Sequence, residues 1–265
     1  MAATQGTDRG ARTATGLLRL AMAVALGGAA WTTATRYSHL NGLLYQRGYL
    51  DLEAVTHMDG GAAMLLALVG LATLARRLPW GLFYAVLWFA LEAVALTLDG
   101  GAALSNWTVA AHAVRILTPL ALFFLIRGRV LWAEFLLRAA LAATFVAHGI
   151  EALSEVPAFL DLLLLSARRL GWSLTESGAG ALLMAIGTVD IALALLLCAG
   201  RLRAVSAYMA FWGAATLVAR MSAGGLVHWP EAVERIHHVA APAALFILWS
   251  ARARVPGKTS PSNFA

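Results

Sequence analysis

Residues 178–199 read GAGALLMAIGTVDIALALLLCA, an apolar run that contains a single acidic or basic residue, Asp190. A helix needs about 20 apolar residues to cross a hydrocarbon core about 30 Å thick. The whole chain has a matching composition, because 60% of its 265 residues are hydrophobic and only 13% are charged. A water-soluble domain has about 45–50% apolar and about 25% charged residues. The sequence therefore predicts an all-α membrane protein in contact with the lipid bilayer, and it excludes a disordered chain.

Seven further stretches have a similar length and character. The first of them follows Arg9, Arg12 and Arg19, a pattern that also occurs in secretory signal segments. We interpret it as a membrane span, because a similar segment recurs in the middle of the chain, where no signal could be cleaved. In total we predict eight transmembrane helices, at residues 16–34, 57–75, 79–98, 107–126, 131–151, 178–199, 203–221 and 232–250.

The short connections between these stretches alternate in charge. Arginines in such loops are retained on the cytoplasmic side of a membrane. This rule predicts that both termini are in the cytoplasm, and we expect a multi-pass protein of a bacterial-type inner membrane. It also explains the net charge of +6 without nucleic acid, which we exclude as a partner. The basic residues assigned to the inner side are Arg9, Arg12, Arg19, Arg76, Arg77, Arg127, Arg129, Arg138, Arg201, Arg203, Arg252, Arg254 and Lys258.

Short motifs recur in the two halves of the chain. Tyr84-x3-Trp88-x3-Glu92 returns 124 residues later as Tyr208-x3-Trp212-x3-Thr216. Four spans in each half give the halves the same orientation, so we predict two tandem parallel four-helix repeats. Further matches are Leu17-Leu18-Arg19 with Leu136-Leu137-Arg138, Gly100-Gly101 with Gly224-Gly225, and His112-x2-Arg115-x3-Pro119 with Arg235-x2-His238-x3-Pro242. The expected organisation is a cytoplasmic tail at 1–15, repeats at 16–128 and 129–254, and a second cytoplasmic tail at 255–265.

Ionisable residues within the spans gather toward the outer side of the membrane. Such groups are costly in hydrocarbon, so they normally face the interior of a helix bundle and pair with one another. We therefore predict a polar, histidine-rich chamber beneath the outer surface. Candidate catalytic residues are His148, His238, Arg115, Arg235 and Glu92; candidate cofactor-binding residues are His112, His57, Trp88, Trp212, Tyr84 and Tyr208; candidate metal ligands are His237 and His238.

Each of these residues also has a purely structural interpretation. Histidines near helix ends often anchor a helix at the membrane interface, and aromatic stripes with helical spacing often pack in the core. Asp190 differs, because a lone carboxylate near the middle of a span is usually functional. The single cysteine, Cys198, excludes a disulfide framework and iron–sulfur ligation.

The fifth predicted span carries a recognisable pattern. Leu137-Arg138 at its inner end is followed by His148-Gly149, then Glu151-Ala152-Leu153 and Pro157-Ala158-Phe159. This pattern resembles the DoxX/DoxD-like family of integral membrane proteins over residues 131–254. The resemblance implies a four-helix unit and a link to membrane redox chemistry, with a quinone as cofactor and with membrane or periplasmic redox partner subunits. His148 and Gly149 match the family's His-Gly pair, whereas the first half has Gly27 and Gly28 at that place.

The sequence leaves three functions open. The first is a quinone-interacting redox subunit, an enzyme only in the sense of an oxidoreductase component. The second is a haem b protein with two axial histidines, either His112 with His238 or His57 with His148. The third is a non-enzymatic carrier or scaffold for a lipid-soluble molecule, in which Asp190 is the only deep polar group.

Overall fold

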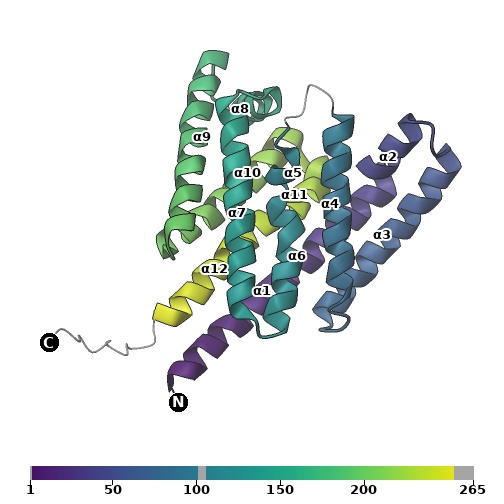
Figure 1. Cartoon of the computed structure of the whole chain (residues 1–265). Coiled ribbons are helices and arrows are strands. Elements are labelled where there is room, and N and C mark those ends of the chain that lie inside the picture. The colour runs from purple at the N-terminus through teal and green to yellow at the C-terminus, as the bar shows by residue number, and fades with distance from the viewer. Residues whose placement is uncertain (1, 101–105, 254–265) are drawn as a thin grey trace.

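The computed structural model describes residues 2–100 and 106–253, and every regular element among them is helical (Figure 1). The prediction of an all-helical chain is confirmed for these residues. Gly101, Arg254, Lys258 and the predicted tail at 255–265 lie outside them. The elements are α1 (Ala2–Arg36), α2 (His39–Gln46), α3 (Leu52–Leu74), α4 (Gly81–Asp99), α5 (Thr108–Ala111), α6 (Ala113–Ile126), α7 (Val130–Leu153), α8 (Pro157–Arg169), α9 (Glu176–Ala199), α10 (Arg203–Gly224), the 3-10 turn η2 (Leu226–His228), α11 (Trp229–Glu234) and α12 (His237–Ala253).

Five helical segments of the described chain are long and apolar enough to cross a membrane. They are Asp8–Gln46, Leu52–Leu74, Gly81–Asp99, Val130–Leu153 and Glu176–Ala199. Large apolar side chains on these and neighbouring helices point outward, including Leu131 at 66% exposure and Phe211 at 68%. Helices that are apolar on their outer faces as well as on their buried faces are typical of proteins embedded in a lipid bilayer.

Two of the remaining predicted spans are interrupted. The fourth is divided at His112 into α5 and α6, and the eighth is divided near Arg235 into α11 and α12. At the first break, the Thr144 hydroxyl of α7 accepts a hydrogen bond from the backbone N–H of Val114 (3.0 Å). A neighbouring helix therefore supplies an acceptor for an N–H in the first turn of α6, where no carbonyl of its own helix is available.

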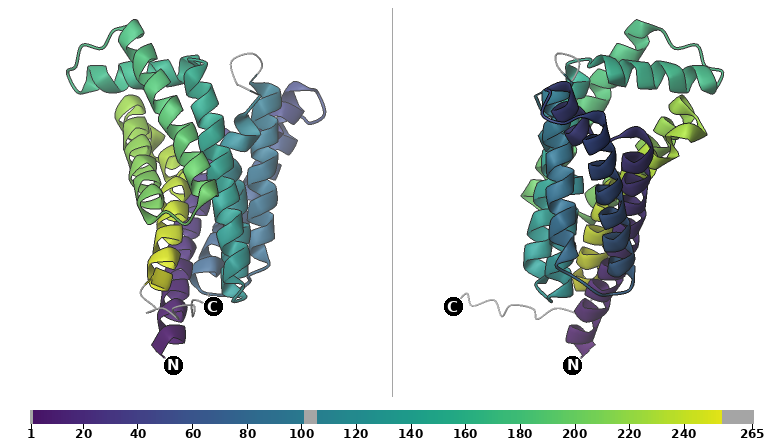
Figure 2. Two further views of the ribbon diagram at one scale, coloured as in Figure 1. Left: turned by 60° about the vertical axis from the view of Figure 1, so that its left-hand side comes forward. Right: turned by 90° about the vertical axis from the view of Figure 1, so that its right-hand side faces the viewer.

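The bundle combines contacts between helices that are close in sequence with contacts between helices that are distant in sequence (Figures 1 and 2). α1 packs against α3 and α12, and α7 packs against α9 and α6. α4 contacts α2 and α6, while α10 contacts α8 and α12. The N-terminal end of α1, the C-terminal end of α12 and the α3–α4 and α6–α7 turns share one end of the bundle (Figure 1). The helix α8 lies across the opposite end (Figure 2).

Glycines allow two pairs of helices to approach closely. A Cβ on Gly187 of α9 would lie 2.6 Å from the carbonyl oxygen of Gly149 on α7, and one on Gly213 of α10 would lie 2.3 Å from the carbonyl oxygen of His238 on α12. Pro242 cannot donate to that His238 carbonyl four residues earlier, so the carbonyl is free to face α10. A Cβ on Gly149 would in turn lie 2.9 Å from the carbonyl oxygen of Gly187, so the glycine of the His148-Gly149 pair allows the close approach of α7 and α9.

The end of the bundle that holds the α3–α4 turn (Arg76, Arg77) and the α6–α7 turn (Arg127, Arg129) is its arginine-rich end. It contains a buried carboxylate, Glu134, whose side chain is only 3% exposed. It accepts hydrogen bonds from Arg201 (2.5 Å), Arg252 (2.5 Å) and the indole N–H of Trp249 (3.0 Å). These partners come from the α9–α10 connection and from α12, so one side chain of α7 ties three parts of the second half together.

Candidate functional site

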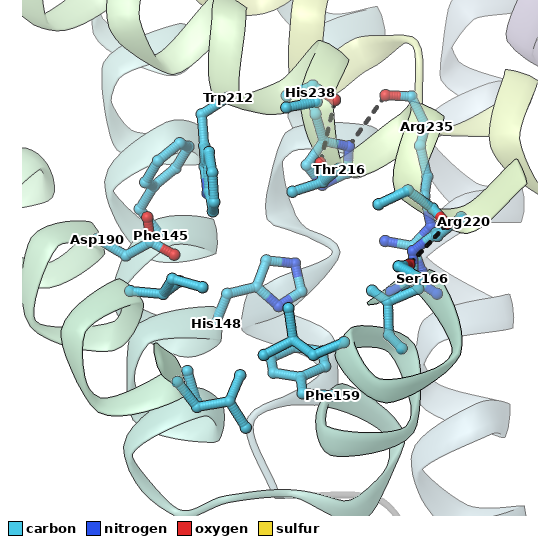
Figure 3. A pocket seen from close by; sticks show the side chains of 18 residues that line it. Phe145, His148, Phe159, Ser166, Asp190, Trp212, Thr216, Arg220, Arg235 and His238 are labelled. Carbon is cyan, nitrogen blue, oxygen red and sulfur yellow. Dashed lines mark hydrogen bonds between the residues drawn. The ribbon is translucent and has the colours of Figure 1, made fainter. Parts of the chain in front are cut away.

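The structure encloses a cavity of about 270 Å³ in the second half of the chain (Figure 3). Its walls come from α7, α8, α9, α10 and α12 and are mainly apolar, with Phe145, Phe159 and Trp212 as the aromatic members. Its polar members are His148, Ser166, Asp190, Thr216, Arg220, Arg235 and His238.

His148 is held at the centre of this cavity by its neighbours (Figure 3). Its Nδ1 lies 2.9 Å from a carboxylate oxygen of Glu151, one helical turn later. Its ring lies 5.7 Å from that of Phe159 on α8 and 6.1 Å from that of His238. A carboxylate can only accept, so Nδ1 carries a proton, and in the neutral imidazole Nε2 is then an acceptor.

His238 has the same protonation pattern for a different reason. Its Nδ1 lies 3.2 Å from the backbone carbonyl oxygen of Arg235, which can only accept a hydrogen bond. Its Nε2 is buried and has no hydrogen-bond partner among the described residues. The cavity is therefore lined by two imidazoles whose Nε2 atoms are free to accept a hydrogen bond from a bound molecule.

Asp190 lies on the wall of the cavity that α9 forms, near Phe145 (Figure 3). Its side chain is buried in the apolar middle of α9. A carboxyl group in such surroundings needs a polar partner or a proton. Arg220 and Arg235 supply donors elsewhere in the lining, so the cavity presents acceptors and donors to the same volume.

A second cavity, of about 200 Å³, lies between the first half of the chain and the segment 231–235, and it is lined by more charged groups. Glu92 accepts hydrogen bonds from the backbone N–H groups of His39 (3.1 Å) and Leu40 (3.0 Å) at the start of α2. Arg115 forms an ion pair with Glu234, and Glu234 also accepts from the Thr32 hydroxyl (2.8 Å). Most of the charges in this cavity are therefore already paired within the protein.

The predicted chamber is thus divided between two cavities. His148, His238 and Trp212 line the first, while Glu92, Arg115, His112 and Trp88 line the second. Arg235 contributes to both linings.

Four predicted site residues are in neither lining. The His57 side chain is 79% exposed and lies 3.7 Å from Glu53. Tyr84 and Tyr208 pack beside Trp88 and Trp212, with ring centroids 6.3 Å and 6.5 Å apart. His237 is fully buried with its ring against Phe89. His237 and His238 therefore face different surroundings, and no group of three or more His, Cys, Asp or Glu side chains within residues 2–100 and 106–253 is arranged to hold a metal ion.

Sequence reasoning missed the contribution of α8. Phe159 and Ser166 enter the first cavity from this short helix, which lies between the predicted spans at 131–151 and 178–199. The available signal was its position directly after His148 and Glu151. A segment that folds back over the end of α7 brings its first turn onto those side chains.

Comparisons with protein-family models, with curated proteins and with solved structures gave no match to this chain.

Proposed function

We propose that the chain forms eight membrane spans arranged as two tandem parallel four-helix repeats, at 16–128 and 129–254. The packing supports this, because the main helix contacts recur at equivalent positions of the two repeats. α1 contacts α3 and α12, as α7 contacts α9 and α6; α4 contacts α2 and α6, as α10 contacts α8 and α12. The two cavities also use matching positions, with Trp88 and Glu92 in one and Trp212 and Thr216 in the other.

We further propose that the second repeat binds a quinone and acts as a DoxX/DoxD-like redox subunit, together with a membrane or periplasmic partner. The observation that carries this proposal is an apolar cavity that contains two imidazole acceptors and two guanidinium groups. Guanidinium N–H groups can donate to a quinone carbonyl, and a neutral Nε2 can accept the hydroxyl proton of the reduced form. The aromatic walls suit a planar ring with a hydrocarbon tail.

The haem alternative finds less support in the geometry. Of the two ligand pairs that the sequence favoured, His112 and His238 line different cavities. In the other pair His57 is exposed on the outer surface of α3, whereas His148 is in the cavity. The carrier alternative depends on Asp190, because transport requires a polar site deep in the membrane.

The test is to purify the protein in mild detergent, record its visible spectrum and extract bound quinone with organic solvent. We expect a colourless protein that carries quinone, and at least a tenfold loss of quinone in His148→Ala because the central acceptor is removed. His57→Ala is the matched control and should retain quinone. A Soret band would replace the proposal with the haem alternative. A protein that neither carries nor binds added quinone, yet takes up a lipid-soluble solute in an Asp190-dependent manner, would favour the carrier.

The proposed inner-membrane orientation has a separate test. Reporter enzymes fused after Arg77 and after Trp172 should report opposite sides of the membrane, with the Arg77 fusion in the cytoplasm. Both residues follow the ends of described helices, so the fusions interrupt no span. A cytoplasmic signal from the Trp172 fusion would contradict the proposed orientation.

A further inference from the structure

Three arginines surround a small third cavity at the arginine-rich end of the bundle. It shares no lining residue with the cavity proposed to bind quinone. The cavity has a volume of about 40 Å³. Arg19 of α1 and Arg76 and Arg77 of the α3–α4 turn contribute its charged groups. The other residues that line it, all within the described part of the chain, are Thr73, Pro79, Leu82 and Ile126, so none of them is acidic.

Arg19 has donors that the described protein does not use. Its Nε and Nη1 atoms are buried and have no hydrogen-bond partner among the described residues. The corresponding arginine of the second half, Arg138, donates instead to the carbonyl oxygens of Leu197 (2.8 Å) and Cys198 (2.8 Å) at the end of α9. Buried guanidinium donors are normally satisfied, so the contrast between Arg19 and Arg138 indicates a missing acceptor beside Arg19.

Arg76 is held in a conformation that favours glycine. Its φ is +59°, and the turn is closed by a hydrogen bond from the Arg77 N–H to the Ala72 carbonyl (2.8 Å). The equivalent turns after α6 and α8 have Gly128 and Gly171 at this place, with φ of +71° and +74°. Tyr37, Leu78 and Glu155 also have positive φ, but glycine adopts this region without strain, so Arg76 can be replaced by glycine without a backbone penalty.

We propose that Arg19, Arg76 and Arg77 bind the phosphate of an anionic phospholipid headgroup. Phosphate oxygens accept from several guanidinium donors at once, which matches the unused donors of Arg19 and the exposed side chains of Arg76 and Arg77. Basic pockets between helices at the cytoplasmic side of a membrane recognise such headgroups. This site requires that the chain spans a bilayer, but it does not depend on quinone binding.

The test compares lipid retention in delipidated protein after incubation with phosphatidylglycerol or phosphatidylcholine, measured by native mass spectrometry. We expect the wild type to retain phosphatidylglycerol in preference. Arg19→Gln and Arg76→Gly should lower that retention at least tenfold, while Arg129→Gln, which removes an exposed charge from the same end of the bundle, should leave it unchanged. Arg76→Gly should also melt no lower than the wild type, because glycine adopts the positive φ without strain, so its loss of lipid cannot be attributed to misfolding.

Three results would overturn the proposal. Retention of phosphatidylglycerol by Arg19→Gln and Arg76→Gly would show that these guanidinium groups do not hold the headgroup. An equal loss in Arg129→Gln would show only a general attraction to anionic lipid. Displacement of the lipid by millimolar inorganic phosphate would identify a site for a free phosphate ion, provided that phosphate raises the melting temperature of the protein as much as the lipid does.

Discussion

Replacing Glu134 with alanine is expected to lower the free energy of unfolding by about 3–5 kcal/mol. The side chain is 3% exposed and accepts from Arg201, Arg252 and Trp249. Its removal leaves the buried indole N–H of Trp249 without an acceptor and the partly exposed guanidinium of Arg252 without its ion pair. Because Trp249 and Arg252 both belong to α12, we expect the contact between α12 and α7 to weaken.

The measurement is the melting temperature in detergent, followed by size-exclusion chromatography, with the wild type as reference. Glu53→Ala is the matched control, since that side chain is 85% exposed and should change the stability little. Glu134→Gln should give an intermediate loss, because the amide oxygen still accepts from Trp249 but the charge is gone. An unchanged melting temperature in Glu134→Ala would show that the network contributes nothing to stability.

Replacing Gly213 with alanine is expected to cost about 1–3 kcal/mol of stability through overpacking and to abolish ligand binding in the second-half cavity. The new Cβ would lie 2.3 Å from the carbonyl oxygen and 2.7 Å from the carbonyl carbon of His238. These are backbone atoms, so the conflict is relieved only if α10 and α12 move apart. That movement displaces His238, Trp212 and Thr216 from the positions that line the cavity.

Gly60→Ala provides a control in which the expected change in stability has the opposite sign. A Cβ on Gly60 meets nothing within 4 Å, so alanine should stabilise α3 by about 0.5–1 kcal/mol through its better helix propensity. Both variants are compared by melting temperature and by the amount of quinone extracted. A Gly213→Ala protein that is as stable as the wild type and carries as much quinone would contradict the proposed close contact between α10 and α12.

The helical character of the chain followed from local pattern alone, and the positions of several site residues did as well. The sequence predicted that His148, His238 and Trp212 would share a chamber, and these three do line one cavity. It did not predict that Glu92 and Arg115 would line another. Helical spacing shows which residues share a face of one helix, but the division between cavities depends on which helices are neighbours.

The sequence by itself determined the all-helical fold, the affinity for lipid and the arginine-rich end, because hydrophobic length and charge in short loops are local properties. Only the tertiary structure decided that the fourth and eighth stretches break at His112 and near Arg235, since the break at His112 is stabilised by Thr144 from another helix. It also decided that Phe159 reaches His148 and that Arg19 keeps unused donors where Arg138 does not. These features arise from contacts between residues distant in the chain, and neither composition nor periodicity encodes such contacts.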